Sequence, residues 1–163
     1  MKNILFVFFI FQCLIISAAT NERHVHIHFK VTNGFGEVTN FIIREIYENG
    51  KIDTVQAIEA NHILDLPVNH KILLEIICPN HVTRRIAINT TVPDNLEYIP
   101  FYELFFDLIE TDVVNLQPNR DEILELLLFP VGYVTYNFEH NSWDNTLSEF
   151  TKTINKLLKK NFK

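Results

Sequence analysis

Apolar and polar residues alternate at every second position along most of residues 24–110, and this period of two restricts the chain to a mainly β fold. The first such segment, HVHIHFKVT, has apolar residues on one face and three histidines with Lys30 on the other. Turn residues interrupt the alternation about every ten positions, as in sandwiches and barrels. The pattern predicts a first strand at residues 24–32 that buries Val25, Ile27, Phe29 and Val31.

Strong turn signals divide the rest of this region into strands. Asn49-Gly50 predicts a hairpin between strands at about residues 39–48 and 51–58, because this dipeptide favours the tight turn that joins antiparallel strands. Further strands are predicted in HILDLP, HKILLEIIC, HVTRRIAIN and FYELFFDLIE. In the last of these, the more apolar face carries Tyr102, Leu104, Phe106 and Leu108 and should point to the core. The segment TTVPDNLEYIP between them is expected to be a loop.

In the C-terminal third of the chain, the strict alternation of apolar and polar residues ends. Residues 111–122 are polar and contain Pro118, which indicates a long connection, and residues 126–138 are expected to be extended. The apolar period then becomes helical, which predicts an amphipathic helix at about residues 145–160. Thr146 and Glu149 have the spacing of a capping box at its start. Its apolar stripe comprises Leu147, Phe150, Ile154, Leu157 and Leu158.

Residues 1–19 have the pattern of a secretory signal peptide, with one basic residue, an apolar stretch and a small-residue end at Ser17-Ala18-Ala19. Cleavage is expected before Thr20, which would leave residues 20–163 as a single domain. Retention of the segment as a membrane anchor is the alternative. We therefore expect an exported protein that is periplasmic, on the cell surface or secreted, and that is not an integral membrane protein once the signal is cleaved.

Charge and cysteine content exclude some classes of function. Loss of Lys2 with the signal peptide would change the formal net charge from −6 to −7, and the basic residues cluster only in the terminal KKNFK, which argues against nucleic-acid binding. Cys78 would then be the single cysteine, so no intramolecular disulfide is expected. Its alternation with Ile72, Leu74 and Ile76 predicts a small buried side chain. The lack of a disulfide framework favours a bacterial envelope protein.

Three blocks of sequence carry a resemblance to a known family: IYENGK, ILDLPVNHKILLEIICPNHVTRRIAINTTVP and FPVGYVTYNFEHNSWD. With them the chain resembles small exported Bacteroidota proteins that contain a carboxypeptidase-regulatory-like domain. The resemblance implies a transthyretin-like (prealbumin-like, Greek-key) β-sandwich of about seven strands, here followed by the C-terminal helix. Val82 follows Asn80-His81 where the family usually has Gly-Tyr, and Phe29 replaces a family glycine. These motifs are turns and strands without a chemical signature.

The histidines of the first strand are the candidate metal ligands. Residues two apart on a strand lie about 6.6 Å apart on one face, so adjacent pairs among His24, His26 and His28 could converge on zinc or copper. His24 and His28 are about 13 Å apart and could not easily share an ion. A site would need a further ligand from His62, His70, His81 or a carboxylate. The other interpretation is an exposed polar strand face.

Two arginines and two aromatic residues are further candidates for binding. Arg84 and Arg85 are adjacent on a predicted strand and must point to opposite faces, so they should not share an anion site, and one should pair with a carboxylate. Tyr136 and Trp143 have polar tips and are candidate partner-binding residues. A Gly-x-Ser-x-Gly motif is absent from the sequence. The C-terminal Tyr-Arg-Gly-Ser of the hydroxyisourate hydrolases, which use a transthyretin-like fold, is replaced by KKNFK.

The sequence thus predicts a non-catalytic binding or interaction module of the cell envelope, without catalytic residues or a cofactor. Its expected partner is another envelope protein or a surface glycan. Two alternatives remain open. One is a periplasmic metal-binding protein that uses His24, His26 and His28, and the less favoured one is a hydrolase of unknown type.

Overall fold

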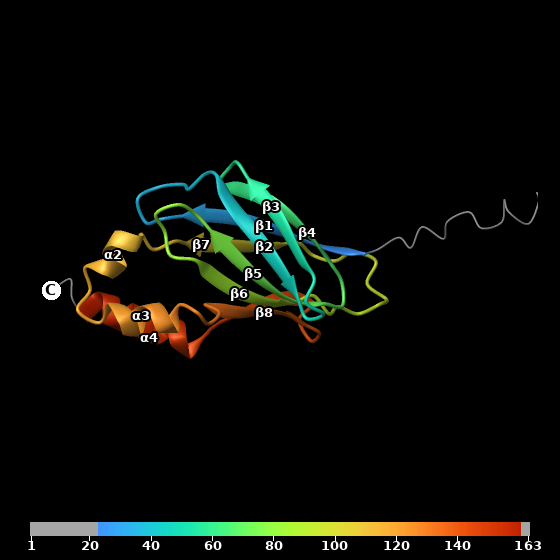
Figure 1. Cartoon of the computed structure of the whole chain (residues 1–163). Coiled ribbons are helices and arrows are strands. Elements are labelled where there is room, and N and C mark those ends of the chain that lie inside the picture. Colours follow the sequence, from blue (N-terminus) through green and yellow to red (C-terminus); the bar gives the residue numbers. More distant parts are fainter. Residues whose placement is uncertain (1–22, 161–163) are drawn as a thin grey trace, which may run out of the picture.

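The computed structural model describes residues 23–160, and the predicted signal peptide lies outside them. Two sheets dominate this part of the chain (Figure 1). The smaller sheet has the order β4-β1-β7, with β1 antiparallel to β4 and parallel to β7. Its strands are β4 (Asn61–Pro67), β1 (His24–Thr32) and β7 (Tyr102–Asp107). The mainly β prediction is confirmed, and β1 has the predicted bounds.

The larger sheet has six strands in the order β3-β2-β5-β6-β8-β9. All neighbours are antiparallel except β6 and β8, which run parallel. With the smaller sheet, the described residues therefore contain nine strands, whereas about seven were predicted. The six strands are β2 (Phe41–Tyr47), β3 (Ile52–Ala57), β5 (Lys71–Ile77), β6 (Arg84–Asn89), β8 (Gly132–Asn137) and β9 (Ser142–Leu147).

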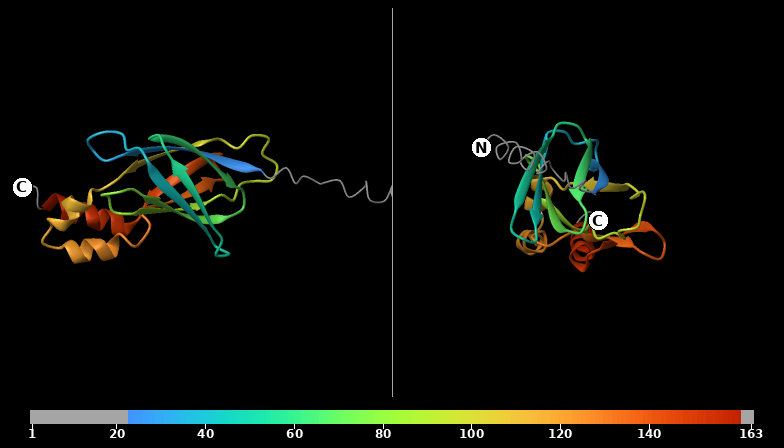
Figure 2. Two further views of the ribbon diagram at one scale, coloured as in Figure 1. Left: turned by 45° about the horizontal axis from the view of Figure 1, so that its top comes forward. Right: turned by 90° about the vertical axis from the view of Figure 1, so that its right-hand side faces the viewer.

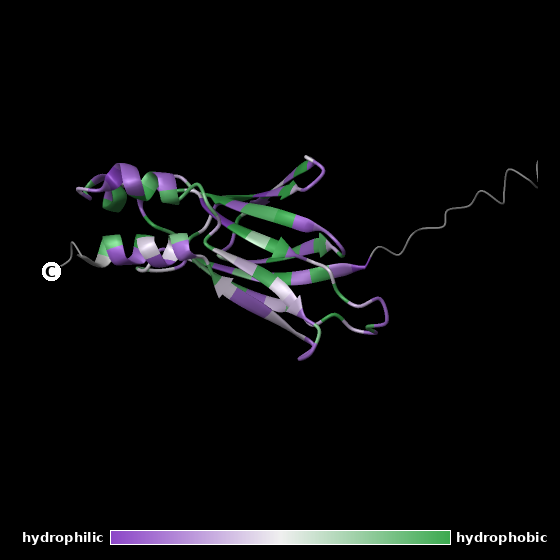
Figure 3. Ribbon diagram, turned by 90° about the horizontal axis from the view of Figure 1, so that it is seen from below, coloured by the Kyte–Doolittle hydropathy of each residue, from purple (hydrophilic) through white to green (hydrophobic). Residues whose placement is uncertain are grey.

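The inner faces of the two sheets share one hydrophobic core. Along most strands, buried side chains alternate with more exposed ones. Figure 3 shows the same alternation as hydrophobic and hydrophilic residues along the ribbons. The predicted inner face of β1 is confirmed, as is the burial of Leu104, Phe106 and Cys78. The largest fully buried side chains of this core include Ile27, Phe29, Phe41, Ile43, Leu66, Ile72, Leu74, Ile76, Ile86, Ile88 and Leu104.

Glycine and asparagine form the tight turns. Gly50 has φ +83° in the β2–β3 hairpin, where its amide donates to the carbonyl of Tyr47 at 2.9 Å. The predicted Asn49-Gly50 hairpin is therefore confirmed. Asn69, Asn80 and Asn141 have φ between 48° and 62° in later turns. Asparagine tolerates this left-handed conformation better than most residues, which explains turns that contain no glycine.

Three helices gather at one end of the molecule, where β1 finishes (Figures 1 and 2). They are α2 (Thr111–Asn115), α3 (Arg120–Leu126) and α4 (Glu149–Lys160). A second hydrophobic cluster holds them to the sheets through Val82, Val114, Ile123, Leu127 and Ile154. The predicted long connection at residues 111–122 is thus replaced largely by α2 and the start of α3. Neither helix in this segment exceeds seven residues.

The C-terminal helix is confirmed, but its start is corrected. Residues 142–147 pair with β8 as strand β9, and this includes Leu147, which the sequence assigned to the helix. The Ser148 Oγ accepts a hydrogen bond from the Thr151 amide at 3.2 Å, so Ser148 is the cap and the predicted Thr146–Glu149 pair is wrong. The extended segment predicted at residues 126–138 shortens to Gly132–Asn137 because Leu126 ends α3.

Within the described residues, no helix is long and apolar enough to span a membrane.

Candidate functional site

The outer face of the six-stranded sheet carries a row of apolar side chains that crosses five strands. The strand register places Ile52 opposite Ile46, Ile46 opposite Leu73, Leu73 opposite Ala87 and Ala87 opposite Tyr133. We call these five residues the apolar row. Ile52 and Tyr133 are exposed, at 56% and 44%, and the other three are partly exposed. Their position on a solvent-facing sheet surface marks a candidate interaction site.

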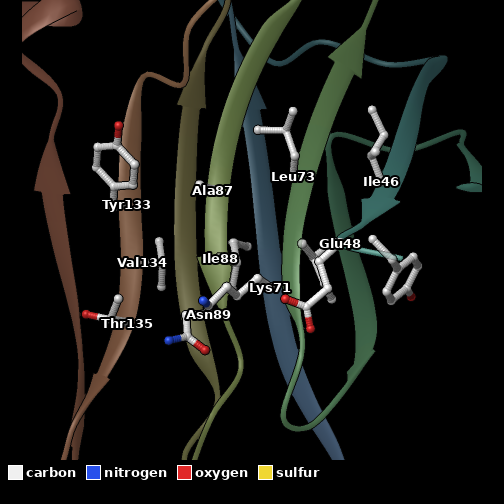
Figure 4. Close-up of a pocket in the computed structure, with 12 residues that line it drawn as sticks. Ile46, Glu48, Lys71, Leu73, Ala87, Ile88, Asn89, Tyr133, Val134 and Thr135 are labelled. Carbon is white, nitrogen blue, oxygen red and sulfur yellow. The ribbon is translucent and has the colours of Figure 1, made fainter. Parts of the chain in front are cut away.

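The apolar row is hollowed at its centre. A groove of about 470 Å³ is lined by four of its members, together with Lys71, Asn89 and Thr135. Figure 4 shows Ile46, Leu73, Ala87 and Tyr133 side by side across four strands. Ala87 is small and lies between two large neighbours in the register, so its position forms the floor of the groove. A groove of this size can accept several side chains of a partner.

Charged side chains border the apolar row on one side. Arg44 Nη1 donates to Glu75 Oε2 at 3.0 Å, and Arg85 Nε donates to Glu75 Oε1 at 2.7 Å. Glu75 is buried between the two arginines, and Arg85 also donates to the Leu127 carbonyl at 3.0 Å. The prediction that one arginine of the Arg84-Arg85 pair meets a carboxylate is confirmed. These charged hydrogen bonds satisfy the buried Glu75 carboxylate and link β2, β5 and β6 on the outer face.

The three histidines lie on the outer face of the smaller sheet, and among the described residues only His26 of the three meets a charged partner. Its Nδ1 lies 2.5 Å from Oδ1 of Asp65, directly across the β1–β4 pair. The ring of His28 stacks on Phe101 with centroids 4.8 Å apart, and His24 and His26 border a shallow hollow of about 190 Å³. Asp65 is thus a carboxylate across the sheet from His26.

The other candidate ligands do not join this pair. The rings of His70 and Tyr47 meet edge to face with centroids 5.7 Å apart, and His81 Nδ1 lies 2.8 Å from the Pro79 carbonyl oxygen. His62 lies opposite Phe29 in the β1–β4 register. Residues 23–160 contain no group of three histidine, cysteine or acidic side chains placed to hold a metal ion. Metal binding by His24, His26 and His28 stays a prediction.

Tyr136 and Trp143 face each other across the β8–β9 pair, on the core side. Tyr136 is buried, and its ring meets Trp143 edge to face with centroids 5.3 Å apart. The indole Nε1 of Trp143 donates to the Pro100 carbonyl at 2.7 Å, which fastens the loop at residues 90–101 to the hairpin. Both residues hold the structure together, and a role in partner binding stays a prediction.

Cys78 is buried at the end of β5, and burial raises the pKa of its thiol. A thiol with a raised pKa supplies less thiolate at neutral pH, so it is a poor nucleophile. The structure therefore agrees with the interpretation of Cys78 as a small core residue.

Sequence reasoning missed the apolar row. The sequence signal for the row is the nearly continuous apolar run ILLEII in β5. In a strand with one face in water, apolar and polar residues should alternate strictly. Leu73 and Ile77 interrupt that alternation, and both lie on the outer face. Comparisons of the chain with protein-family models, with curated proteins and with solved structures find no match.

Proposed function

We propose that this protein is an exported, non-catalytic interaction module of the cell envelope that binds a partner protein through the apolar row. The observation that carries the proposal is the row itself, with its groove between two large side chains on an outer sheet face. From Ile52 to Tyr133 the row crosses four strand spacings, or about 19 Å. That span fits the apolar stripe of about 13 helical residues.

A protein partner suits this surface better than a glycan. Sugar sites depend on polar groups that satisfy hydroxyls, whereas the centre of the groove presents Ile46, Leu73 and Ala87. The adjoining guanidinium groups of Arg44 and Arg85 are already engaged with Glu75. An amphipathic segment could bury its apolar side chains in the row and keep its polar side chains in water.

The chain path supports the proposed Greek-key, transthyretin-like class. Along the sequence the chain crosses between the sheets five times, and β4 returns beside β1 after the β2–β3 hairpin. Such returns are the basis of Greek-key connections. We propose that β1–β7 form the transthyretin-like unit and that the β8–β9 hairpin extends its larger sheet.

Site-specific photocrosslinking in the source cells tests the proposed function. A photoreactive phenylalanine analogue at position 133 should capture one defined envelope protein, and Leu73→Asp should abolish the capture. The matched control places the same analogue at position 105, which is exposed on the outer face of the smaller sheet. Equal capture from both positions, or capture that survives Leu73→Asp, would show that the row is not the binding surface. If purified envelope glycan bound to the wild type but not to the Leu73→Asp variant, the partner of the row would be a glycan and not a protein.

Export has its own test. N-terminal sequencing of the protein from the envelope fraction should start at Thr20 or within two residues of it. A mature chain that begins at Met1 would reject cleavage and favour the anchor.

The His26–Asp65 contact favours metal binding as a second function. A carboxylate beside a histidine ring is common around metal sites, where it orients the ring. Metal analysis of the purified protein, repeated with His26→Ala, should then show zinc or copper in stoichiometric amount in the wild type only. Metal content that is equal in both proteins, or absent from both, would reject this function.

A further inference from the structure

Arg84 is a buried arginine on the core side of the six-stranded sheet. It begins β6 and points away from Arg85, which lies on the outer face with Glu75. Only 8% of Arg84 is exposed, although it shares its side of the strand with Ile86 and Ile88. A charged side chain is rarely buried this far without a partner.

Within the described structure, the guanidinium of Arg84 is unsatisfied at its buried Nε. Its buried Nε has no hydrogen-bond partner among these residues, and Arg84 is absent from their ion pairs. Burial lowers the pKa of Arg84 to about 10, while the nearby charge of Asp107 acts in the opposite direction. The group is therefore still a cation at neutral pH. A buried cation whose Nε makes no hydrogen bond destabilises the ligand-free protein.

Arg84 lies beside a cavity. A cavity of about 330 Å³ opens between β6, β7, β8, β9 and α4, and Arg84 lines it. Three polar side chains, Asn145, Thr151 and Asn155, share the lining with apolar ones that include Leu104, Phe106 and Leu158. The cavity thus joins the positive charge of Arg84, the negative charge of Asp107 and a few hydrogen-bonding groups to an apolar wall.

These features select a class of ligand. A guanidinium presents a planar set of donors that matches a carboxylate with two parallel hydrogen bonds. The apolar walls favour a short hydrocarbon body. Asp107 also lines the cavity and is exposed, so its negative charge repels a ligand with one negative charge less than it repels phosphate.

We propose that this cavity is a binding site for a small carboxylic acid with a short aliphatic body, whose carboxylate pairs with Arg84. The site lies on the opposite side of the six-stranded sheet from the apolar row, so it is independent of the proposed partner surface. The ligand carboxylate supplies the hydrogen-bond acceptor that the Nε of Arg84 lacks among the described residues.

Isothermal titration calorimetry of the mature protein with octanoate tests the proposal. Octanoate should bind at one site, and octanamide, its neutral counterpart, should bind at least about tenfold more weakly because a charged hydrogen bond is lost. Inorganic phosphate, which has charge but no hydrocarbon, should also bind weakly. Equal affinity for octanoate and octanamide, tighter binding of phosphate, or no binding of octanoate at millimolar concentration would overturn the proposal.

Neighbouring variants locate the site. Arg84→Met should weaken octanoate binding at least about tenfold. Arg85→Met, on the outer face, should leave the octanoate affinity unchanged. Leu73→Ser should also leave it unchanged, which would show that octanoate does not adsorb to the apolar row. Octanoate affinity that falls with Arg85→Met or Leu73→Ser but not with Arg84→Met would reject the site.

Nuclear magnetic resonance gives a readout that needs no variant. Octanoate should shift the side-chain signals of Arg84 Nε and of the Asn145 and Asn155 amides in the wild-type protein. Shifts confined to the outer face of either sheet would overturn the proposal.

Discussion

Tyr47 and Glu45 form a hydrogen-bonded pair that is buried on the core side of β2. The Tyr47 hydroxyl donates to Glu45 Oε2 at 2.6 Å. Burial raises the pKa of Tyr47, and the hydrogen bond to Glu45 raises it further. The hydroxyl therefore stays protonated and remains a donor throughout the neutral range.

Tyr47→Phe should lower the free energy of unfolding by about 1–3 kcal/mol, because the buried Glu45 carboxylate loses its donor. Urea denaturation at pH 7 measures the change. Tyr98→Phe, at an exposed position, is the control and should have almost no effect. If the two variants unfolded at the same urea concentration, the Tyr47–Glu45 hydrogen bond would contribute nothing.

Arg84 and Arg85 are neighbours in sequence, but their replacement should change stability in opposite directions. Arg84→Met removes a buried cation whose Nε has no hydrogen-bond partner among the described residues, and it should raise the free energy of unfolding of the ligand-free protein by about 1–4 kcal/mol. Arg85→Met removes one of two partners of the buried Glu75 and should lower it. Thermal unfolding of both variants checks the signs, and a loss of stability in Arg84→Met would indicate that the chain itself satisfies the guanidinium.

For single residues, the sequence predicts the face of a strand on which a side chain lies as well as its burial. The adjacency of Arg84 and Arg85 was enough to place them on opposite faces, because the period of a strand is two. What each arginine meets could not be predicted, since Glu75 and the cavity come from other strands and from α4. The same limit applies to His26, whose neighbour Asp65 is 39 positions away.

Among the elements, the strands before residue 110 were predicted well and the segments after it were not. Tight turns and strict alternation define the early strands locally. The β8–β9 turn instead depends on Asn141 with φ 48°, without a glycine to mark it. Leu147 also has helical spacing to Phe150 and Ile154, so β9 was partly assigned to the helix. Pairing with β8 overrides that local pattern.

The start of α4 can be tested with two substitutions. Ser148→Ala should lower the free energy of unfolding by about 1 kcal/mol, because the Thr151 amide loses its acceptor. Thr146→Ala is the matched control, since Thr146 lies in β9 and is exposed. Denaturant unfolding measures both. A larger effect at Thr146 would restore the capping pair that the sequence suggested.

In the whole molecule, hydrophobic burial is divided between the large core of the sheets and a small cluster at the helical end. The small cluster contains Val114, Ile123 and Leu127 from the region of α2 and α3, together with Ile154 from α4. Short helices obtain most of their stability from such packing, because they are marginal alone.

Hydrogen exchange should therefore detect a difference in local stability. Backbone amides of α2 and α3 should exchange faster than those of β2, β5 and β6, which lie inside the larger sheet. Native-state exchange followed by mass spectrometry would measure this for each segment. Equal protection of the helices and the central strands would mean that the two clusters unfold as one unit.

The two sheets differ in width, with three strands facing six. The extra strands occupy about three strand spacings, or roughly 14 Å. The loop at residues 90–101 contacts part of the β8–β9 hairpin through Trp143, and α4 lies beside another part, where the Arg84 cavity opens next to β7. The number of strands, more than the shape of any side chain, thus creates this interior space. An added strand beside β7 would cover more of the cavity mouth, whereas deleting the β8–β9 hairpin would remove the wall that Asn145 and Leu147 form.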